Sequence, residues 1–334
     1  MDSALYNSFT TSRGFVYRYY YYAPDSNVDH DIEISSTTLI FLHGFPTTSH
    51  IWRHQTAYFH EQGFSLLIPD MLGFGGTSKP TEPDAYRANL LCKDILELMN
   101  VVGAERTIVI GHGLGSKIVS RLANFYSERF LGFAFLAVPY CVPKPTSTIE
   151  HTIWSTKKMC GYELCGHSVF FAEENANEII ETHMESFFSA IFPRDPKLWV
   201  TEVAPIGALK AWLEADKRTV TLSCIAKQDK DVWHNAFAKD GLAAPLCWHK
   251  AIVDGTNADD DKLVPLEKYT IKVPVFFGAA HYDYISRSVQ GIATTTQYCT
   301  NATIREFYQG HWLQVAAPAE VNRELYSWMM DIIA

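Results

Sequence analysis

The sequence predicts an α/β protein in which a mostly parallel central sheet carries helices on both faces and a helical cap interrupts the core. Continuous apolar segments that end near glycine or proline are typical of strands buried on both faces. Several of them alternate with helical segments, which indicates βαβ units. Because the alternation stops in mid-chain, we expect a first core part over residues 1–143, a cap over 144–265 and a second core part over 266–334.

Five segments have the pattern of buried parallel strands. They are TTLIFLHGF (37–45), FSLLIPD (64–70), RTIVIGH (106–112), GFAFLAVP (132–139) and VPVFFGAA (273–280). Helical periodicity is found in YRANLLCKDILELMNVVG (86–103) and GSKIVSRLANFYSERF (115–130), and a last helix is expected in PAEVNRELYSWMMDII (318–333). These elements would form the sheet and the helices that cover it.

The middle of the chain is helical and aromatic, as in ANEIIETHMESFFSAIF (176–192) and GALKAWLEAD (207–216). A helical cap inserted here would cover the carboxyl ends of the strands, where parallel sheets bind ligands. Its aromatic residues are candidates to line an apolar site, although helical spacing places most such residues in the core of a cap. These candidates are Trp154, Phe170, Phe171, Phe187, Phe188, Trp212 and Trp248.

Composition excludes several classes of partner and cofactor. The 334-residue chain has a net charge of -9, which argues against a nucleic-acid partner, and it has no apolar tract long enough to insert into a membrane. Seven scattered cysteines without a C-x-x-C or Cys/His cluster predict no metal site. Reduced thiols and no visible secretory signal predict a cytoplasmic location. We expect a small-molecule substrate and no organic cofactor; a homodimer is left open.

The stretch VIGHGLGSKIV (109–119) has the form of a strand, a tight turn and a helix. In a G-x-S-x-G elbow the middle residue carries the nucleophile, but here it is Gly113. Gly111 and Gly115 would permit the tight turn and the close approach of helix to strand. The backbone N–H of Leu114, at the start of the helix, would stabilise developing negative charge.

Three more segments fit around this turn. HGFP (43–46) follows the first expected strand, so the N–H of Phe45 is a second candidate oxyanion donor, and Phe45–Pro46 is a candidate cis peptide. In GAAHYDY (278–284), Asp283 stands where a carboxylate could orient an imidazole. His311 lies in a loop before the last helix. The chain order of elbow, Asp and His is that of an α/β-hydrolase triad.

With PDMLGFGGTSKP (69–80), the cap segments GYELCGH (161–167) and PLCWHKAIVDG (245–255), and GHWLQVAAPAEVN (310–322), the chain resembles α/β-hydrolases of the epoxide hydrolase branch, fungal-type members in particular. In that family the elbow reads G-H-D-x-G, and its Asp attacks the epoxide carbon to form an ester. A His–Asp pair then activates water, and two cap tyrosines hydrogen-bond the epoxide oxygen.

The resemblance implies a role for each matching position. Asp283 and His311 match the base pair, Phe45 and Leu114 match the oxyanion donors, and Tyr162 is the best match for the first cap tyrosine. Candidates for the surroundings of the site are His112, which should point away from the pocket, Trp248 and Trp312.

The sequence departs from the family at two positions: Gly113 stands where the nucleophile belongs, and His249 stands where the second cap tyrosine belongs. Three interpretations stay open, namely an inactive variant of a hydrolase, an enzyme with a changed reaction, and a non-catalytic ligand-binding protein. The second predicts acid–base chemistry by His311 and Asp283 on an apolar oxygenated molecule, such as isomerisation, elimination, cyclisation or water addition, in secondary metabolism. His249 would be a second proton-transfer group, or merely packs beside Trp248.

Overall fold

A computed structural model describes residues 1–25 and 31–333 of the chain. One sheet contains the strands in the order β1-β2-β4-β3-β5-β6-β7-β8. Their bounds are β1 Tyr6–Thr10, β2 Val16–Tyr22, β3 Thr37–Leu42, β4 Ser65–Pro69, β5 Arg106–His112, β6 Gly132–Leu136, β7 Val275–Ala280 and β8 Ala302–Phe307. Strands β3 to β8 run parallel, whereas β2 is antiparallel to both β1 and β4. The predicted α/β class with a mostly parallel sheet is confirmed.

The five expected strands are β3 to β7, and every residue of β3, β4, β6 and β7 is buried. Both β3 and β6 end earlier than the apolar runs suggest, because the chain leaves the sheet there to build loops. Strands β1 and β2 were not expected. The tyrosine-rich β2 pairs with β4, which places Tyr20 opposite Ile68, and β1 forms the antiparallel edge of the sheet.

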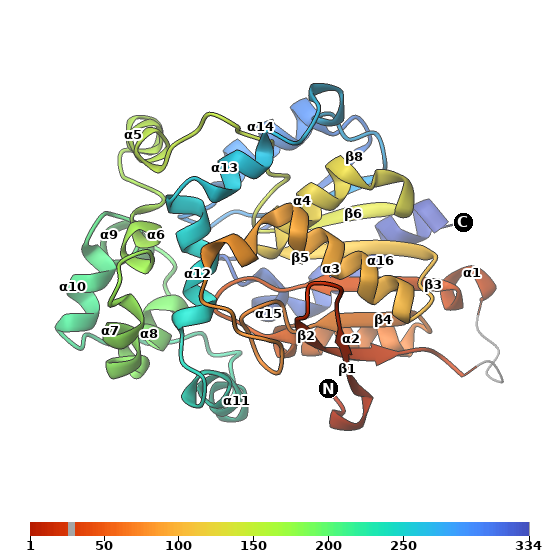
Figure 1. The fold of residues 1–334 in the computed structure, drawn as a ribbon, viewed down its shortest axis with the longest axis horizontal. Coiled ribbons are helices and arrows are strands. Elements are labelled where there is room, and N and C mark those ends of the chain that lie inside the picture. The colour runs from red at the N-terminus through yellow and green to blue at the C-terminus, as the bar shows by residue number, and fades with distance from the viewer. Residues whose placement is uncertain (26–30, 334) are drawn as a thin grey trace.

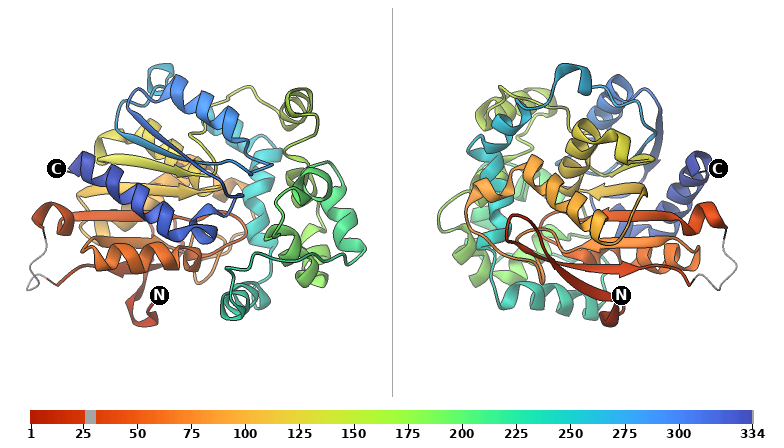
Figure 2. Two further views of the ribbon diagram at one scale, coloured as in Figure 1. Left: turned by 180° about the vertical axis from the view of Figure 1, so that it is seen from behind. Right: turned by 45° about the vertical axis from the view of Figure 1, so that its right-hand side comes forward.

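Helices cover both faces of the sheet. Those of the core are α1 Ile32–Ser35, α2 Arg53–Glu61, α3 Ala88–Val101, α4 Gly115–Phe125, α14 Ser288–Tyr298, α15 Leu313–Ala316 and α16 Pro318–Ile333. Helices α3 and α4 lie in front of the sheet in Figure 1, and α2 and α16 lie on the opposite face, toward the viewer in the left panel of Figure 2. This three-layer arrangement buries the apolar strands on both sides.

Between β6 and β7 the described chain is helical. The bounds are α5 Ile149–Cys160, α6 Gly166–Phe171, α7 Ala176–Thr182, α8 Met184–Ile191, α9 Leu198–Glu202, α10 Ala208–Glu214, α11 Lys227–Ala238, α12 Ala243–Val253 and α13 Thr256–Asp261. The segment 176–192, expected to be helical, forms the two helices α7 and α8, since His183 leaves the helical conformation between them. The domain boundaries at 143 and 265 stay a prediction.

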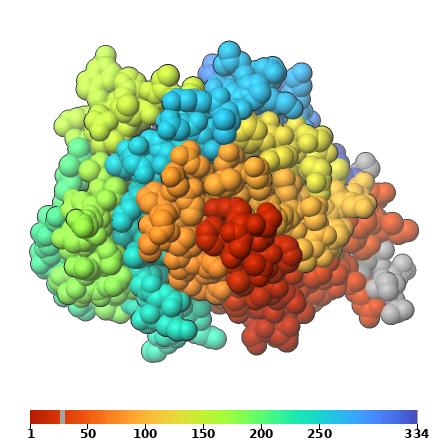
Figure 3. All heavy atoms as spheres, in the orientation of Figure 1, coloured from red at the N-terminus to blue at the C-terminus, as the bar shows by residue number. Residues whose placement is uncertain are grey.

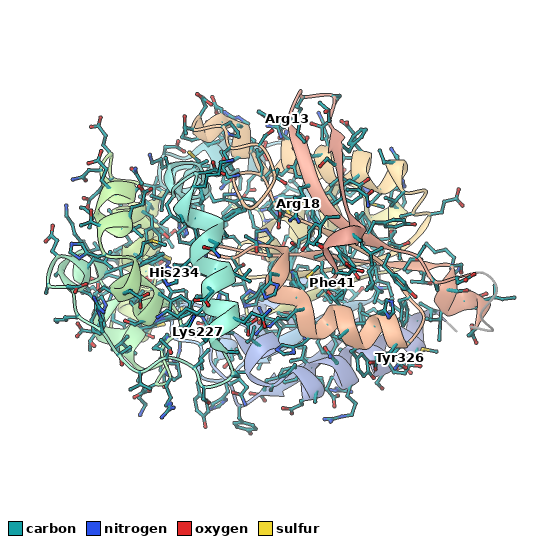
Figure 4. The ribbon with its side chains drawn as sticks, turned by 90° about the horizontal axis from the view of Figure 1, so that it is seen from below. Arg13, Arg18, Phe41, Lys227, His234 and Tyr326 are labelled. Carbon is teal, nitrogen blue, oxygen red and sulfur yellow. The ribbon has the colours of Figure 1, made fainter. Side chains whose placement is uncertain are left out.

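Helices α5 to α13 gather at the carboxyl ends of the parallel strands, at the left of Figure 1, and Figure 3 shows their atoms packed directly against those of the core. In Figure 4, α11, which carries Lys227 and His234, lies between the other cap helices and α2. Asp229 of α11 pairs with Arg53 Nε at 2.8 Å, and the Trp233 indole donates to the carbonyl of Pro46. These contacts fasten the cap to the core beside the HGFP turn.

Most of the aromatic candidates of the cap pack into its own core. The side chains of Phe170, Phe187, Phe188 and Trp212 are buried among other apolar residues, whereas Trp154 is 59% exposed. Within residues 1–25 and 31–333, no helix combines the length and apolar character needed to cross a bilayer. In that same part of the chain, no group of three or more His, Cys, Asp or Glu side chains is arranged to hold a metal ion.

Helix α4 packs so closely on the sheet that Gly115 has no room for a side chain. A Cβ added to Gly115 would overlap the carbonyl oxygen of Leu42, whereas one added to Gly103, at φ +67°, would meet no atom within 4 Å. We expect Gly103→Ala to cost about 1–2 kcal/mol of left-handed strain. Gly115→Ala should cost more, about 3 kcal/mol, because its Cβ would overlap a backbone oxygen of the sheet that cannot move aside. Thermal unfolding followed by circular dichroism compares them; a smaller loss of Tm for Gly115→Ala would contradict this packing.

Candidate active site

The elbow lies between β5 and α4. Strand β5 ends at His112 and α4 begins at Gly115, with Gly113 at φ +57° between them. A Cβ on Gly111 would come within 2.7 Å of the Val119 side chain. Glycine is therefore required on either side of the turn, because a side chain there would prevent α4 from starting directly against β5 and β3. The central position is presented at the carboxyl edge of the sheet.

A buried Asp–His pair stands over this turn. Asp283 follows β7 and His311 follows β8, and Nδ1 of His311 lies 2.6 Å from Oδ2 of Asp283. The other carboxylate oxygen accepts hydrogen bonds from the backbone N–H groups of Ile285 and Ser286 at 2.9 and 3.0 Å. Asp283 is fully buried. Because both carboxylate oxygens are held, the imidazole has a fixed direction, with Nε2 left for chemistry.

His311 Nε2 points at the empty elbow position. A Cβ built on Gly113 would lie 3.4 Å from this nitrogen, with no backbone atom closer than Gly44 Cα at 3.8 Å. The structure thus brings His311, Asp283 and Gly113 together as the sequence predicts. His112 holds the loop that carries His311, because its Nε2 lies 2.9 Å from the carbonyl oxygen of His311. It does not line the cavity described next.

The cavity above Gly113 has a volume of about 130 Å³ and is walled by both core and cap. Its lining residues are Phe45, Pro46, Gly113, Leu114, Lys117, Val138, Cys141, His167, Phe171, Ile191, Trp199, Val203, His249, Ile285, His311 and Trp312. Most of them are apolar, with a few imidazoles and one ammonium group as exceptions. A cavity of this character suits an apolar molecule with a few oxygen functions.

The two expected oxyanion donors meet at this cavity. Phe45–Pro46 is a cis peptide, as the sequence suggests, and a Cβ on Gly44 would come within 2.7 Å of the Leu114 nitrogen. The HGFP turn and the elbow therefore touch. Among the described residues, neither the Phe45 nor the Leu114 N–H donates to a protein acceptor. Both amides are free to stabilise negative charge on a ligand oxygen.

Two of the candidates are used elsewhere. Tyr162 does not line the cavity, because its hydroxyl donates to the carbonyl of Tyr284 at 2.8 Å. Trp248 is buried with its indole N–H on the carbonyl of Leu72 at 2.9 Å, so it joins α12 to the 71–80 loop. The neighbouring His249 faces the opposite way and lines the cavity, as Trp312 does.

Sequence reasoning missed His167, which lines the cavity from α6. The family resemblance calls for a tyrosine, which selects Tyr162, but α6 presents the last residue of GYELCGH instead. The rings of His167 and His249 are 5.8 Å apart and nearly perpendicular. His249 Nδ1 lies 3.1 Å from the Ser168 hydroxyl. Within the described chain, His167 Nδ1 and His249 Nε2 are buried without a hydrogen-bond partner.

Burial keeps these two cap imidazoles neutral. It lowers the pKa of His167 to about 4, and it lowers the pKa of His249 well below its ordinary value, with the nearby His167 adding to the effect. A neutral imidazole offers one donor and one acceptor nitrogen. The cap therefore supplies hydrogen-bonding groups that carry no charge near neutral pH.

The lowered pKa of His249 makes stability depend on pH. In the unfolded chain His249 takes up a proton near pH 6.5, whereas in the folded chain it stays neutral at this pH. The free energy of unfolding is therefore largest above pH 6.5 and falls as the pH is lowered below it. In the wild type this residue lowers the free energy of unfolding by about 1.4 kcal/mol for each pH unit below 6.5. We expect this contribution to be absent in His249→Gln. Guanidinium unfolding at pH 7.5 and 5.0 measures it, with the exposed His151→Gln as control. An unchanged pH dependence in His249→Gln would contradict the burial argument.

The comparisons with known proteins agree with this architecture. A family model described as alpha/beta hydrolase fold matches residues 37–154. "Bifunctional epoxide hydrolase 2" of Sus scrofa is 26% identical over 307 residues, which cover 90% of this chain and 53% of the relative. "Epoxide hydrolase srdG" of Neurospora crassa is 24% identical over 344 residues, which cover 96% of this chain and 94% of the relative.

Among solved structures, a mutant epoxide hydrolase of Vigna radiata superposes with a TM-score of 0.76 at 19% identity, covering 98% of this chain and 99% of the other. The chain spans about half the length of the mammalian relatives it matches. The chain has the α/β-hydrolase fold and resembles the epoxide hydrolases over nearly its whole length.

Proposed function

We propose that this chain is an enzyme of epoxide hydrolase type that performs acid–base chemistry without a covalent enzyme intermediate. The observation that carries the proposal is the placement of His311 Nε2, 3.4 Å from where a Cβ of Gly113 would be, with no nucleophilic side chain between the imidazole and the elbow. An ester to the elbow cannot form at a glycine. A ligand atom or a water molecule takes the space beneath His311 instead.

The surrounding groups suit proton abstraction. A C–H or O–H of the ligand that faces His311 Nε2 gives up its proton to the imidazole, and Asp283 stabilises the resulting imidazolium through the 2.6 Å hydrogen bond. The negative charge left on a ligand oxygen is met by the amides of Phe45 and Leu114. These steps are shared by isomerisation, elimination, cyclisation and addition of water.

The cap completes the site with neutral donors. His249 and His167 carry no charge near neutral pH, so they hydrogen-bond a second ligand oxygen without attracting the first anion away from the amides. The apolar remainder of the wall favours a small, mostly hydrocarbon molecule. We place this activity in the cytoplasm and in secondary metabolism. Seven free thiols support the cytoplasm, and the likeness to a fungal relative supports secondary metabolism.

Hydrogen–deuterium exchange tests the proton transfer without knowledge of the natural substrate. An enolisable ketone such as 2-indanone is incubated with the enzyme in D₂O, and loss of its α-proton signal is followed by NMR. We expect His311→Ala to slow the enzyme-dependent exchange by a factor of about 100 or more, the usual worth of a general base. His281→Ala, which alters an imidazole 44% exposed near the same loop, is the control. Exchange at the same rate in His311→Ala would exclude His311 as the base.

A further inference from the structure

Lys117 is a cation in the wall of an otherwise apolar cavity. It lies one turn beyond Gly113 on α4, lines the cavity, and retains 20% of its side-chain accessibility. Burial lowers the pKa of its ammonium group, and the nearby Arg121 lowers it further, while Asp261 opposes both effects. The acid–base steps described above do not use this residue.

Two cations of α4 are directed at a single carboxylate. Its Nζ lies 2.9 and 3.2 Å from the two carboxylate oxygens of Asp261, and the fully buried Arg121 donates to the same carboxylate at 2.8 Å. Two cations therefore share one carboxylate. The preceding residue, Asp260, accepts from the backbone N–H of Asn89 and interacts with Lys117 only at longer range. Of the three Nζ protons, at least one has no acceptor within the part of the chain that the structure describes.

Lys117 is only partly accessible, so a proton of its ammonium group that has no protein acceptor is poorly hydrated and can bind an acceptor on a ligand. Charge-assisted hydrogen bonds to a carboxylate are the strong way to supply one. Apart from the Cys141 thiol and the three imidazoles, the side chains that line the cavity offer no acceptor.

We propose that Lys117 binds a carboxylate of the substrate, so that the enzyme acts on a small, mostly apolar organic acid. Binding of the acid at Lys117 does not depend on the acid–base function proposed above; only the reaction that follows binding does. The carboxylate completes the shell of Lys117 and the remainder of the acid lies along the apolar wall toward His311.

Matched probes separate the carboxylate from the hydrocarbon part. Phenylacetate and phenylacetamide are titrated at pH 8 while the intrinsic tryptophan fluorescence is recorded, to which Trp199 and Trp312 of the cavity wall contribute. We expect the wild type to bind the acid about tenfold more tightly than the amide, as one charge-assisted hydrogen bond allows. Lys117→Met should lose this preference and keep its affinity for the amide, whereas Lys117→Arg should retain much of the preference.

The control is Lys79→Met. Lys79 is 19% accessible and pairs with Asp240 at 3.2 Å, but it does not line the cavity, so its loss should leave both affinities unchanged. Equal affinity for acid and amide in the wild type, no binding of either, or a preference that survives in Lys117→Met would overturn the proposal and leave Lys117 as a link between α4 and α13.

If Lys117→Met does not fold, Lys117→Gln replaces it and the same comparison is read from that variant. His311→Ala distinguishes this proposal from the proposed function. The variant should lose deuterium exchange yet still prefer phenylacetate over phenylacetamide. Loss of the acid preference in His311→Ala, with Lys117 intact, would assign the carboxylate to His311 and contradict the role of Lys117.

Discussion

The buried hydrogen bond between Asp283 and His311 determines what this site can do. Asp283 is fixed by two backbone amides, and the loop that carries His311 is fixed by His112 from the elbow strand. Strands β5, β7 and β8 are thus tied at one point, and Nε2 is directed at Gly113. In a hydrolase with a carboxylate at the elbow, such an imidazole would activate water against an ester. Above a glycine no such ester can form, and the same imidazole faces the open cavity.

The polar groups of the cavity are divided between its two walls. The core contributes the imidazole, two backbone amides and the Lys117 ammonium, and the cap contributes the uncharged His167 and His249. Because burial holds the cap imidazoles neutral, charge in the cavity is concentrated on the core side. This separation suits a ligand with an anionic or developing anionic end against the core and a neutral oxygen beneath the cap.

Much of this could be predicted from sequence, for identifiable reasons. Strands β3 to β7 are continuous apolar runs, and the glycine turn, Asp283 and His311 each follow such a run. Strands β1 and β2 are short and tyrosine-rich, so their place at the antiparallel edge depends on pairing that periodicity does not reveal.

The cap was the less predictable part, because its helices are short and their rotation is set by tertiary packing. Helix α12 directs Trp248 to Leu72 and His249 to the cavity, and α6 exposes His167 while Tyr162 bonds Tyr284. Intact-protein mass spectrometry after exposure to styrene oxide tests the central claim most directly, with Gly113→Asp as the variant able to form an ester. Peptide mapping then locates any adduct. The account predicts an ester at position 113 of the variant and no adduct on a cavity side chain of the wild type; a covalent adduct on a cavity side chain of the wild type would contradict it.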